Sequence, residues 1–346
     1  MRLVEFSDLK TGMQIADDFY SINGSILAKK GTEITERYID NLSQYEIPYL
    51  YVLDDYSEDL KIQCTITSKT RNEATQNLKK LYLAIQSRNK GLYHKHMQAC
   101  LESIDKLTED IISEKIDLYD VFDIKMIENY SYQQPVNVTV ISLIIGKCLE
   151  LSSLEMYRLA VGAFFHDIGN MFMPIEILEK KGKLTNEEYE LIKTHTMEGY
   201  RFAKDEFNLP MRSYLAILQH HERYDGGGYP TMKAGEDISI YGRIVAIADV
   251  FDALSSRRRQ RDALNPAQAF KIIIEGMGTA FDPKLVRAFA DRVSPYPIGF
   301  TIKLEDGREC IVTKNFRGKP FNPEARVIKE DNKRLETPYL ITVGVD

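Results

Sequence analysis

The chain has 346 residues and six histidines, and four of these histidines share one stretch with two aspartates. The six clustered residues are His166, Asp167, His195, His220, His221 and Asp249. A neutral imidazole donates one lone pair to one metal ion, whereas a carboxylate has two oxygens and can bridge two ions. This mixture of side chains is therefore typical of a dinuclear site for cations such as iron or manganese.

His166-Asp167 follows the apolar run AVGAFF, so an imidazole and a carboxylate are expected to leave a buried helix together. Burying unpaired polar groups is costly unless a metal or an ion pair compensates them. For one such pair taken alone, a structural hydrogen bond is the simpler explanation. The other histidines of the region favour the metal.

His220 and His221 are adjacent, so on a continuous helix their side chains would diverge by about 100°. We therefore expect them to take different positions in a shared cavity. The residues 225–230, DGGGYP, predict a glycine loop whose backbone N–H groups can approach phosphate, with a plain surface turn as the alternative. Asp249 interrupts the apolar helix RIVAIADVFDAL, which favours a ligand role.

Most of these side chains must be positioned by helices, because nearly every window around them has helical periodicity. The turn signals Asn23-Gly24 and Asp306-Gly307 predict hairpins towards the two ends of the chain, and Thr35 predicts a helix start. We expect a small α/β module in residues 1–55, a helical linker or stalk in 56–118, a helix bundle in 119–293 and a small β module in 294–346.

Composition narrows the class of function. Hydrophobic residues make up 44% of the chain, which allows one substantial core, and the net charge of −6 offers no basic field for duplex DNA. Any nucleotide ligand should thus be small and enclosed. Four cysteines without a CxxC pair argue against a zinc ribbon and a disulfide framework. The N-terminus does not resemble a signal peptide and the stretch 136–149 is too short to cross a bilayer, so we expect a cytoplasmic protein without membrane contact.

In their order, these motifs resemble the HD-GYP subgroup of the bacterial HD-domain phosphohydrolases. The resemblance covers about residues 130–290 and leaves the flanking modules aside. It is carried by Phe165–Gly169, by Lys183–Glu188 leading to His195, by His220–Pro230 and by Arg243–Asp249.

The resemblance implies a mainly α fold, an HD-type helix bundle, and hydrolysis of cyclic di-GMP to pGpG or GMP by a hydroxide that bridges two divalent metal ions. It implies a catalytic centre at His166 and Asp167, with His166, Asp167 and Asp249 on one ion. Asp167 would bridge to a second ion held by His195, His220 and His221. The implied substrate-binding residues are Asp225, Gly228, Tyr229, Pro230, Arg258 and Arg261.

Two of these binding assignments have simple alternatives. Arg258 and Arg261 could clamp phosphate with forked donors, but a solvated basic face explains them equally well. Tyr229 could stack on a guanine, or it could anchor the glycine loop by packing.

The chain departs from the family pattern at two positions. Gln134 replaces a further ligand histidine, and an amide oxygen binds iron or manganese more weakly than imidazole does. Asn170 replaces a lysine expected near the scissile phosphate. Tyr130 stands where some members carry a third-metal glutamate, so two ions are the expected maximum. His94 and His96 are the remaining histidines, and we do not expect them to replace the missing ligand.

These departures leave two functions open: a metal-dependent cyclic di-GMP phosphodiesterase, or a degenerate HD-GYP domain that binds a cyclic dinucleotide or a protein with little or no hydrolysis. Another nucleotide, such as a cyclic GMP-AMP, is a further alternative. The resemblance also suggests a GGDEF-type or other signalling protein as partner, and the helical linker suggests a homodimer.

Overall fold

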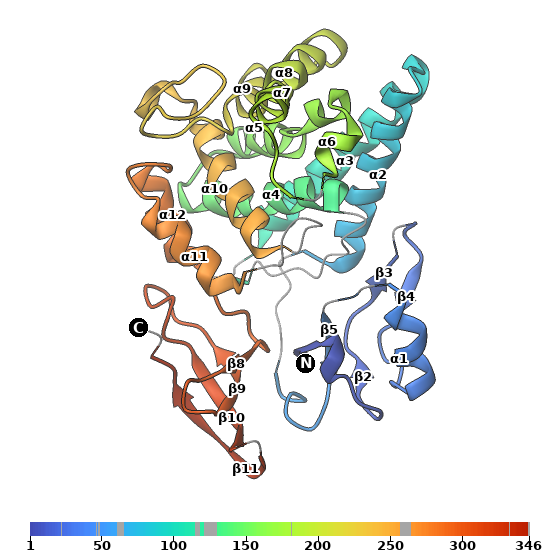
Figure 1. Cartoon of the computed structure of the whole chain (residues 1–346), viewed down its shortest axis with the longest axis vertical. Helices are drawn as coiled ribbons and strands as arrows, with labels where there is room; N and C mark the ends of the chain where they lie inside the picture. The colour runs from blue at the N-terminus through green and yellow to red at the C-terminus, as the bar shows by residue number, and fades with distance from the viewer. Residues whose placement is uncertain are drawn as a thin grey trace. The chain divides into compact units, whose positions relative to one another are not determined.

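The computed structural model describes residues 1–344, except 22, 46, 48, 61–65, 115–117, 121–129, 181, 257–263 and 332. The chain forms two compact units (Figure 1). One unit contains residues 1–72, 115–129 and 290–346, and the other contains residues 73–114 and 130–289. The four-segment division expected from the sequence stays a prediction.

The N-terminal part of the first unit is a small α/β module. Its elements are β1 (Arg2–Glu5), η1 (Phe6–Asp8), β2 (Gln14–Ile15), β3 (Phe19–Tyr20), β4 (Ile26–Ala28), α1 (Glu36–Ser43) and β5 (Tyr49–Leu53). The strands β1, β5 and β2 form an antiparallel sheet in that order. The hairpin predicted at Asn23-Gly24 joins β3 to β4, and Thr35 caps α1 by accepting from the Tyr38 N–H, as predicted.

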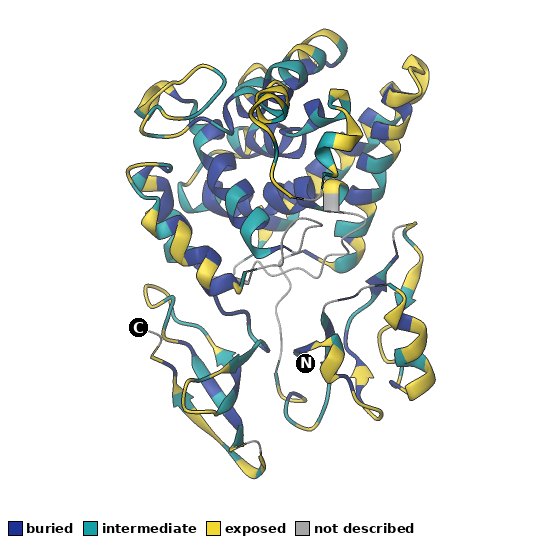
Figure 2. Ribbon diagram, viewed as in Figure 1, coloured by how far each residue is buried: buried dark blue, intermediate teal, exposed yellow. Residues whose placement is uncertain are grey.

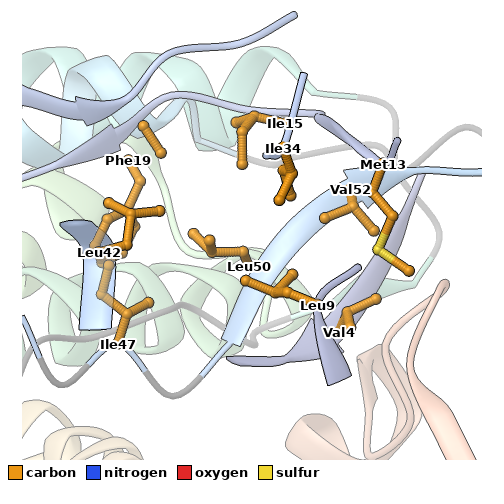
Figure 3. Close-up of a cluster of buried hydrophobic side chains, with 11 residues drawn as sticks. Val4, Leu9, Met13, Ile15, Phe19, Ile34, Leu42, Ile47, Leu50 and Val52 are labelled. Atoms are coloured by element: carbon orange, nitrogen blue, oxygen red, sulfur yellow. The ribbon is translucent and has the colours of Figure 1, made fainter. Parts of the chain in front are cut away.

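The core of this module is formed by hydrophobic side chains from its helix, its strands and the intervening loops (Figure 3). Leu50 and Val52 alternate with half-buried residues along β5, so both point to the same side of the sheet. Leu42 of α1 belongs to the same cluster. The module carries no polar cluster resembling a catalytic site among its described residues.

The C-terminal part of the first unit is a β module. Its strands are β7 (Val293–Ser294), β8 (Thr301–Lys303), β9 (Glu309–Lys314), β10 (Glu324–Glu330) and β11 (Lys333–Thr342), and β7 pairs with β6 (Tyr119–Asp120). The strands β11, β10, β9 and β8 form an antiparallel sheet in that order. The turn predicted at Asp306-Gly307 is confirmed, and Gly307 adopts the positive φ of 85° that such a turn requires.

The second unit is a helix bundle, as expected. Its elements are α2 (Ser68–Gln86, which begins in the first unit), α3 (Lys90–Ser113), α4 (Tyr130–Cys148), α5 (Ser153–Phe164), η3 (Ile168–Phe172), α6 (Ile175–Leu178), α7 (Asn186–Lys193), α8 (His195–Glu206), α9 (Met211–Gln219), η4 (Gly235–Asp237), α10 (Ile240–Ser255), α11 (Pro266–Glu275) and α12 (Pro283–Arg292, which ends in the first unit). Figure 2 shows α4 and α10 as mostly buried, and α4 packs against both α5 and α10. Gln134 of α4 and Asp249 of α10 are among the buried polar residues of these two helices.

Local sequence signals fix where several helices begin. Capping boxes start α5 at Ser152, α7 at Thr185 and α11 at Asn265. The α3 helix, expected in a linker, packs against α4 and α5 of the bundle. Among the described residues, no helix is both long enough and apolar enough to cross a membrane.

Candidate metal centre

The polar residues of the centre come from four different parts of the bundle. Helix α5 ends at Phe164, so His166 and Asp167 lie in the turn that leads into η3. His195 is the first residue of α8, and Asp249 lies within α10. His220 and His221 directly follow the last residue of α9. Helix ends and tight turns therefore aim most of these side chains at one point.

Two glycines allow the segments that carry Asp167 and His195 to meet. A Cβ atom on Gly169 would lie 1.8 Å from the His195 carbonyl oxygen, and one on Gly199 would lie 2.9 Å from the Gly169 nitrogen. Any larger residue at position 169 would push η3 away from α8. The glycine of the HD-x-G motif is therefore required for the close approach of backbone to backbone.

Asp167 lies at the middle of the polar cluster. Its Oδ1 is 3.3 Å from His195 Nε2 and 3.7 Å from His220 Nε2. Its Oδ2 is 3.5 Å from His166 Nε2. The two oxygens of one carboxylate thus face different imidazoles, which is the geometry of a bridging ligand.

Backbone carbonyls fix the tautomer of three histidines. His166 Nδ1 lies 2.7 Å from the Ala163 oxygen, His195 Nδ1 lies 2.7 Å from the Ile192 oxygen, and His220 Nδ1 lies 2.9 Å from the Ile217 oxygen. A carbonyl only accepts hydrogen bonds, so each Nδ1 carries the proton and donates it. Each Nε2 therefore points its lone pair into the centre, as a metal ligand must.

Asp167, His195, His220 and His221 form what we call the histidine cluster. One potential ligand atom from each lies within 4.8 Å of all the others. The Nε2 atoms of His195 and His220 are 3.3 Å apart, and both face the same carboxylate oxygen. These two nitrogens and the carboxylate oxygen all present lone pairs to the same point. This set of ligand atoms therefore fits a bound cation.

The convergence of His220 and His221 corrects one expectation. Adjacent residues were expected to diverge, because they were assumed to continue a helix. Helix α9 ends at Gln219, and both rings instead lie beside His195, with centroid distances of 5.4 Å and 5.1 Å. The chain turn after Gln219 allows both imidazoles to face the same point.

Gln134, His166 and Asp249 form a second group, which we call the glutamine cluster. Their exposed fractions are 3%, 0% and 8%, so all three lie in the interior of the bundle. His166 Nε2 is 3.8 Å from Asp249 Oδ1. The Gln134 amide nitrogen lies 2.6 Å from that same oxygen and 3.2 Å from His166 Nε2. The expected replacement of a ligand by Gln134 thus falls inside the polar centre.

Burial and charge keep the cluster in the protonation states that bind metals. Burial lowers the pKa of His220, and burial together with the nearby His220 lowers the pKa of His221 still further. Burial opposes the ionisation of Asp167, but the surrounding imidazoles lower its pKa well below the usual value. His220 and His221 are therefore neutral and Asp167 is charged near neutral pH, whereas, against the effect of burial, Asp167 and Asp249 raise the pKa of His166 to about 9.

The glycine loop folds back over the end of α9. A Cβ atom on Gly228 would lie 2.3 Å from the Arg223 nitrogen, so only glycine fits there. The Tyr229 ring stacks on His221 at a centroid distance of 4.8 Å, and the Tyr229-Pro230 peptide bond is cis. This contact favours the loop-anchoring interpretation of Tyr229.

Other predicted binding residues have partners in the loop or lie elsewhere. Asp225 forms an ion pair with Arg223 at 2.8 Å and accepts from the Gly227 N–H. The backbone N–H of Asn170 bonds to the Asp167 carbonyl oxygen. Arg258 and Arg261 lie outside the described residues, and so does the side chain of Tyr130. His94 and His96 are not part of the histidine cluster.

Two further residues near the centre were not expected from the sequence. The buried Glu222 accepts hydrogen bonds at 2.7 Å from both the backbone N–H and the hydroxyl of Thr231, which pins the loop after Pro230. Lys193 Nζ lies 5.7 Å from the centre of the Tyr229 ring. The HHE motif was a signal for Glu222, because a carboxylate beside two metal-ligand candidates rarely faces solvent without a role.

Comparisons with known proteins show which family the chain resembles. The model of the HD domain matches residues 109–285. A protein of Pseudomonas aeruginosa named a cyclic di-GMP phosphodiesterase is 32% identical over 238 residues, which cover 69% of this chain and 57% of that protein. A Vibrio cholerae protein named a 3'3'-cGAMP-specific phosphodiesterase is 34% identical over 166 residues, covering 47% of this chain and 35% of that protein. The chain therefore spans little more than half of the first relative's length.

A solved structure shows the same fold. The HDG"Y"P protein of Bdellovibrio bacteriovorus superposes with a TM-score of 0.51 at 17% identity, covering 83% of this chain and 97% of that one. At this identity the likeness concerns the fold alone. Because the HD-domain match spans half of the chain and contains all the recognised motifs, the chain belongs to the HD-domain family, and the HD-GYP resemblance is confirmed.

Proposed function

We propose that this chain is a metal-dependent phosphodiesterase that hydrolyses cyclic di-GMP to pGpG or GMP. The convergence of His195, His220 and Asp167, with lone pairs facing one another, is the observation that carries the proposal. The names of the relatives from Pseudomonas aeruginosa and Vibrio cholerae support a cyclic dinucleotide as the substrate.

The proposed metal ligands follow from the two clusters. His195, His220, His221 and Asp167 would hold one divalent ion, iron or manganese, and His166 and Asp249 would hold a second with the other oxygen of Asp167. Such ions lower the pKa of a bound water and stabilise the charge that develops on phosphoryl oxygens. Backbone carbonyls orient the rings, because each fixes the proton on Nδ1.

The loop and the neighbouring helix would bind the rest of the substrate. Tyr229 lies against His221, so a base or ribose entering the centre would meet the loop first. Lys193 lies beside Tyr229 and could supply the positive charge that Asn170 does not. We keep Asp225, Gly228, Pro230, Arg258 and Arg261 as proposed substrate contacts.

The net charge of −6 fits a small ligand that binds in an enclosed site rather than along a nucleic acid. A cyclic GMP-AMP has the same two phosphodiester groups, so it is the natural competitor of cyclic di-GMP. A cytoplasmic location, a GGDEF-type partner and a homodimer are further proposals, and none of them is needed for the chemistry.

The test is a turnover assay on purified, manganese-loaded or iron-loaded protein with cyclic di-GMP, cyclic GMP-AMP and cyclic di-AMP in excess. We expect linear products from cyclic di-GMP at many turnovers per chain. Tight binding of the dinucleotide without product would instead support the receptor function. Absence of both binding and turnover for all three would contradict the proposal.

A further inference from the structure

Gln134 donates hydrogen bonds to two potential metal ligands. Its Nε2 lies 2.6 Å from Asp249 Oδ1 and 3.2 Å from His166 Nε2. A carboxylate only accepts hydrogen bonds, so the amide must present its nitrogen to Asp249 and not its oxygen. An amide nitrogen carries two hydrogens, one for the Asp249 carboxylate and one for Nε2 of His166 in its neutral form. The glutamine cluster is therefore satisfied by its own side chains.

Among the described residues, no carboxamide like that of Gln134 donates to the histidine cluster. The Nε2 atoms of His195 and His220 lie 3.3 Å apart, and each Nδ1 is already committed to a backbone carbonyl. Asp167 Oδ1, which faces both, adds a charged acceptor. A cation at this point would relieve the repulsion among three acceptors, whereas a cation between His166 and Asp249 would first have to displace two hydrogen bonds.

From this contrast we infer that the two clusters bind metal unequally: the histidine cluster holds one ion tightly, and Gln134 closes the glutamine cluster to a second. A further ion enters only when the amide of Gln134 turns away. The inference rests on the proposed metal centre, and it gives each of its two ions a different affinity.

The side-chain chemistry of position 134 explains why the closure is specific to glutamine. When the amide turns, it can offer its oxygen to an ion, but this oxygen is a weaker ligand for iron or manganese than imidazole. Gln134 thus lowers the affinity for the second ion in two ways. Its hydrogen bonds must be broken before the ion can enter, and its amide oxygen is then a weaker ligand than imidazole. Alanine at position 134 would remove the hydrogen bonds. Histidine would also supply the stronger ligand.

The test measures metal binding alone. The full chain, stripped with chelator, is titrated with Mn²⁺ by calorimetry, and the ions retained after dialysis are counted by mass spectrometry. We expect the wild-type protein to retain one ion and to bind a second at least about tenfold more weakly. Gln134→Ala should raise the affinity for the second ion. Gln134→His should retain two ions after dialysis, and its electron paramagnetic resonance spectrum should be that of a coupled manganese pair.

Gln133→Ala is the matched control, because Gln133 is the same residue type in the same helix, and this variant should behave as the wild type. Two ions retained by the wild-type protein would overturn the inference. Equal affinities for the second ion in the wild type and in Gln134→Ala would overturn the inference as well. This comparison remains valid even if Gln134→His does not fold. Turnover of cyclic di-GMP is assayed separately: a protein with one tight ion and no turnover would contradict the proposed function and leave this inference standing.

Discussion

The histidine cluster and the glutamine cluster lie side by side around Asp167, but their buried acceptors are satisfied in different ways. Both gather acceptors in the interior of a helix bundle, where unpaired polar groups are costly. In the glutamine cluster the amide of Gln134 supplies the donors that His166 and Asp249 need. In the histidine cluster the nitrogens of His195 and His220 face each other and the same Asp167 oxygen, an arrangement that suits a bound cation.

The difference shows that ligand residue types alone do not define a metal site. His166 and Asp249 have the chemistry of ligands, and their geometry permits a shared ion. One neighbouring carboxamide is enough to give them another partner. What matters is whether the acceptors remain unsatisfied after the protein has made its own hydrogen bonds.

The largest effect on metal binding is expected from removal of Asp167, the carboxylate that faces both clusters. Asp167→Ala should lower the affinity of the tight ion by more than about 100-fold, because it removes a ligand and not merely a supporting group. Asp249→Asn should leave that ion in place, since Asp249 belongs to the glutamine cluster. Calorimetric titration with Mn²⁺ measures both. Equal losses of metal in the two variants would mean that the clusters act as one site.

Separating η3 from α8 should disturb the histidine cluster through the backbone. Gly169→Ala would place a Cβ atom 1.8 Å from the His195 carbonyl oxygen, so we expect a loss of about 3 kcal/mol in the free energy of unfolding. In Gly91→Ala the new Cβ would meet nothing closer than 3.8 Å, and this control should be neutral or slightly stabilising. Urea denaturation of the metal-free proteins measures the difference, and equal stability of the two variants would refute the packing argument.

The loop beyond the histidine cluster gives a smaller effect. Thr231→Val removes one of the two hydrogen bonds to Glu222 and should raise KM for cyclic di-GMP about fivefold, since such a bond is worth about 1 kcal/mol. The count of retained metal ions should not change. Met232→Ala alters the exposed neighbouring residue and should leave KM as it is. A lower metal content in Thr231→Val would show that the loop supports the ion instead of the substrate.

Acid should lower the free energy of unfolding of the metal-free protein, because histidines of the histidine cluster become protonated on unfolding. The pKa values of His220 and His221 are lowered from 6.5 by burial, so the unfolded chain binds protons at a pH where the folded chain does not. Stability should therefore fall as the pH drops below 6.5, by about 1.4 kcal/mol per pH unit for each of these two histidines while it stays neutral. Against the effect of burial, the pKa of His166 is instead raised to about 9 by Asp167 and Asp249, so His166 changes the stability only above pH 6.5 and in the opposite sense. Denaturant unfolding with chelator at about pH 6.5 and about pH 5.5 therefore measures the slope due to His220 and His221. His221→Gln should reduce it, and an unchanged slope would assign it to other groups.

Much of the fold could be predicted from local signals. The hairpins at Asn23-Gly24 and Asp306-Gly307 depend on turn residues, and the bundle depends on helical periodicity, so both are visible in short windows of sequence. The gathering of distant histidines followed from the family motifs. These signals concern single elements or known patterns, and the sequence carries them directly.

The details of the centre were harder to predict because they depend on where helices end and on which atoms face each other. The meeting of His220 and His221 requires α9 to end at Gln219. The bond from Gln134 to Asp249 connects α4 to α10 across more than a hundred residues. Glu222 was passed over because its partner Thr231 lies beyond the glycine loop. Such contacts arise only from the three-dimensional arrangement.

Anomalous diffraction tests the central claim most directly. Crystals of the full chain, purified without added metal, would be measured on both sides of the iron and manganese absorption edges. We predict one strong peak within bonding distance of Asp167, His195, His220 and His221, and no comparable peak between His166 and Asp249. Absence of a peak at the four residues, or two peaks of equal strength, would contradict the account.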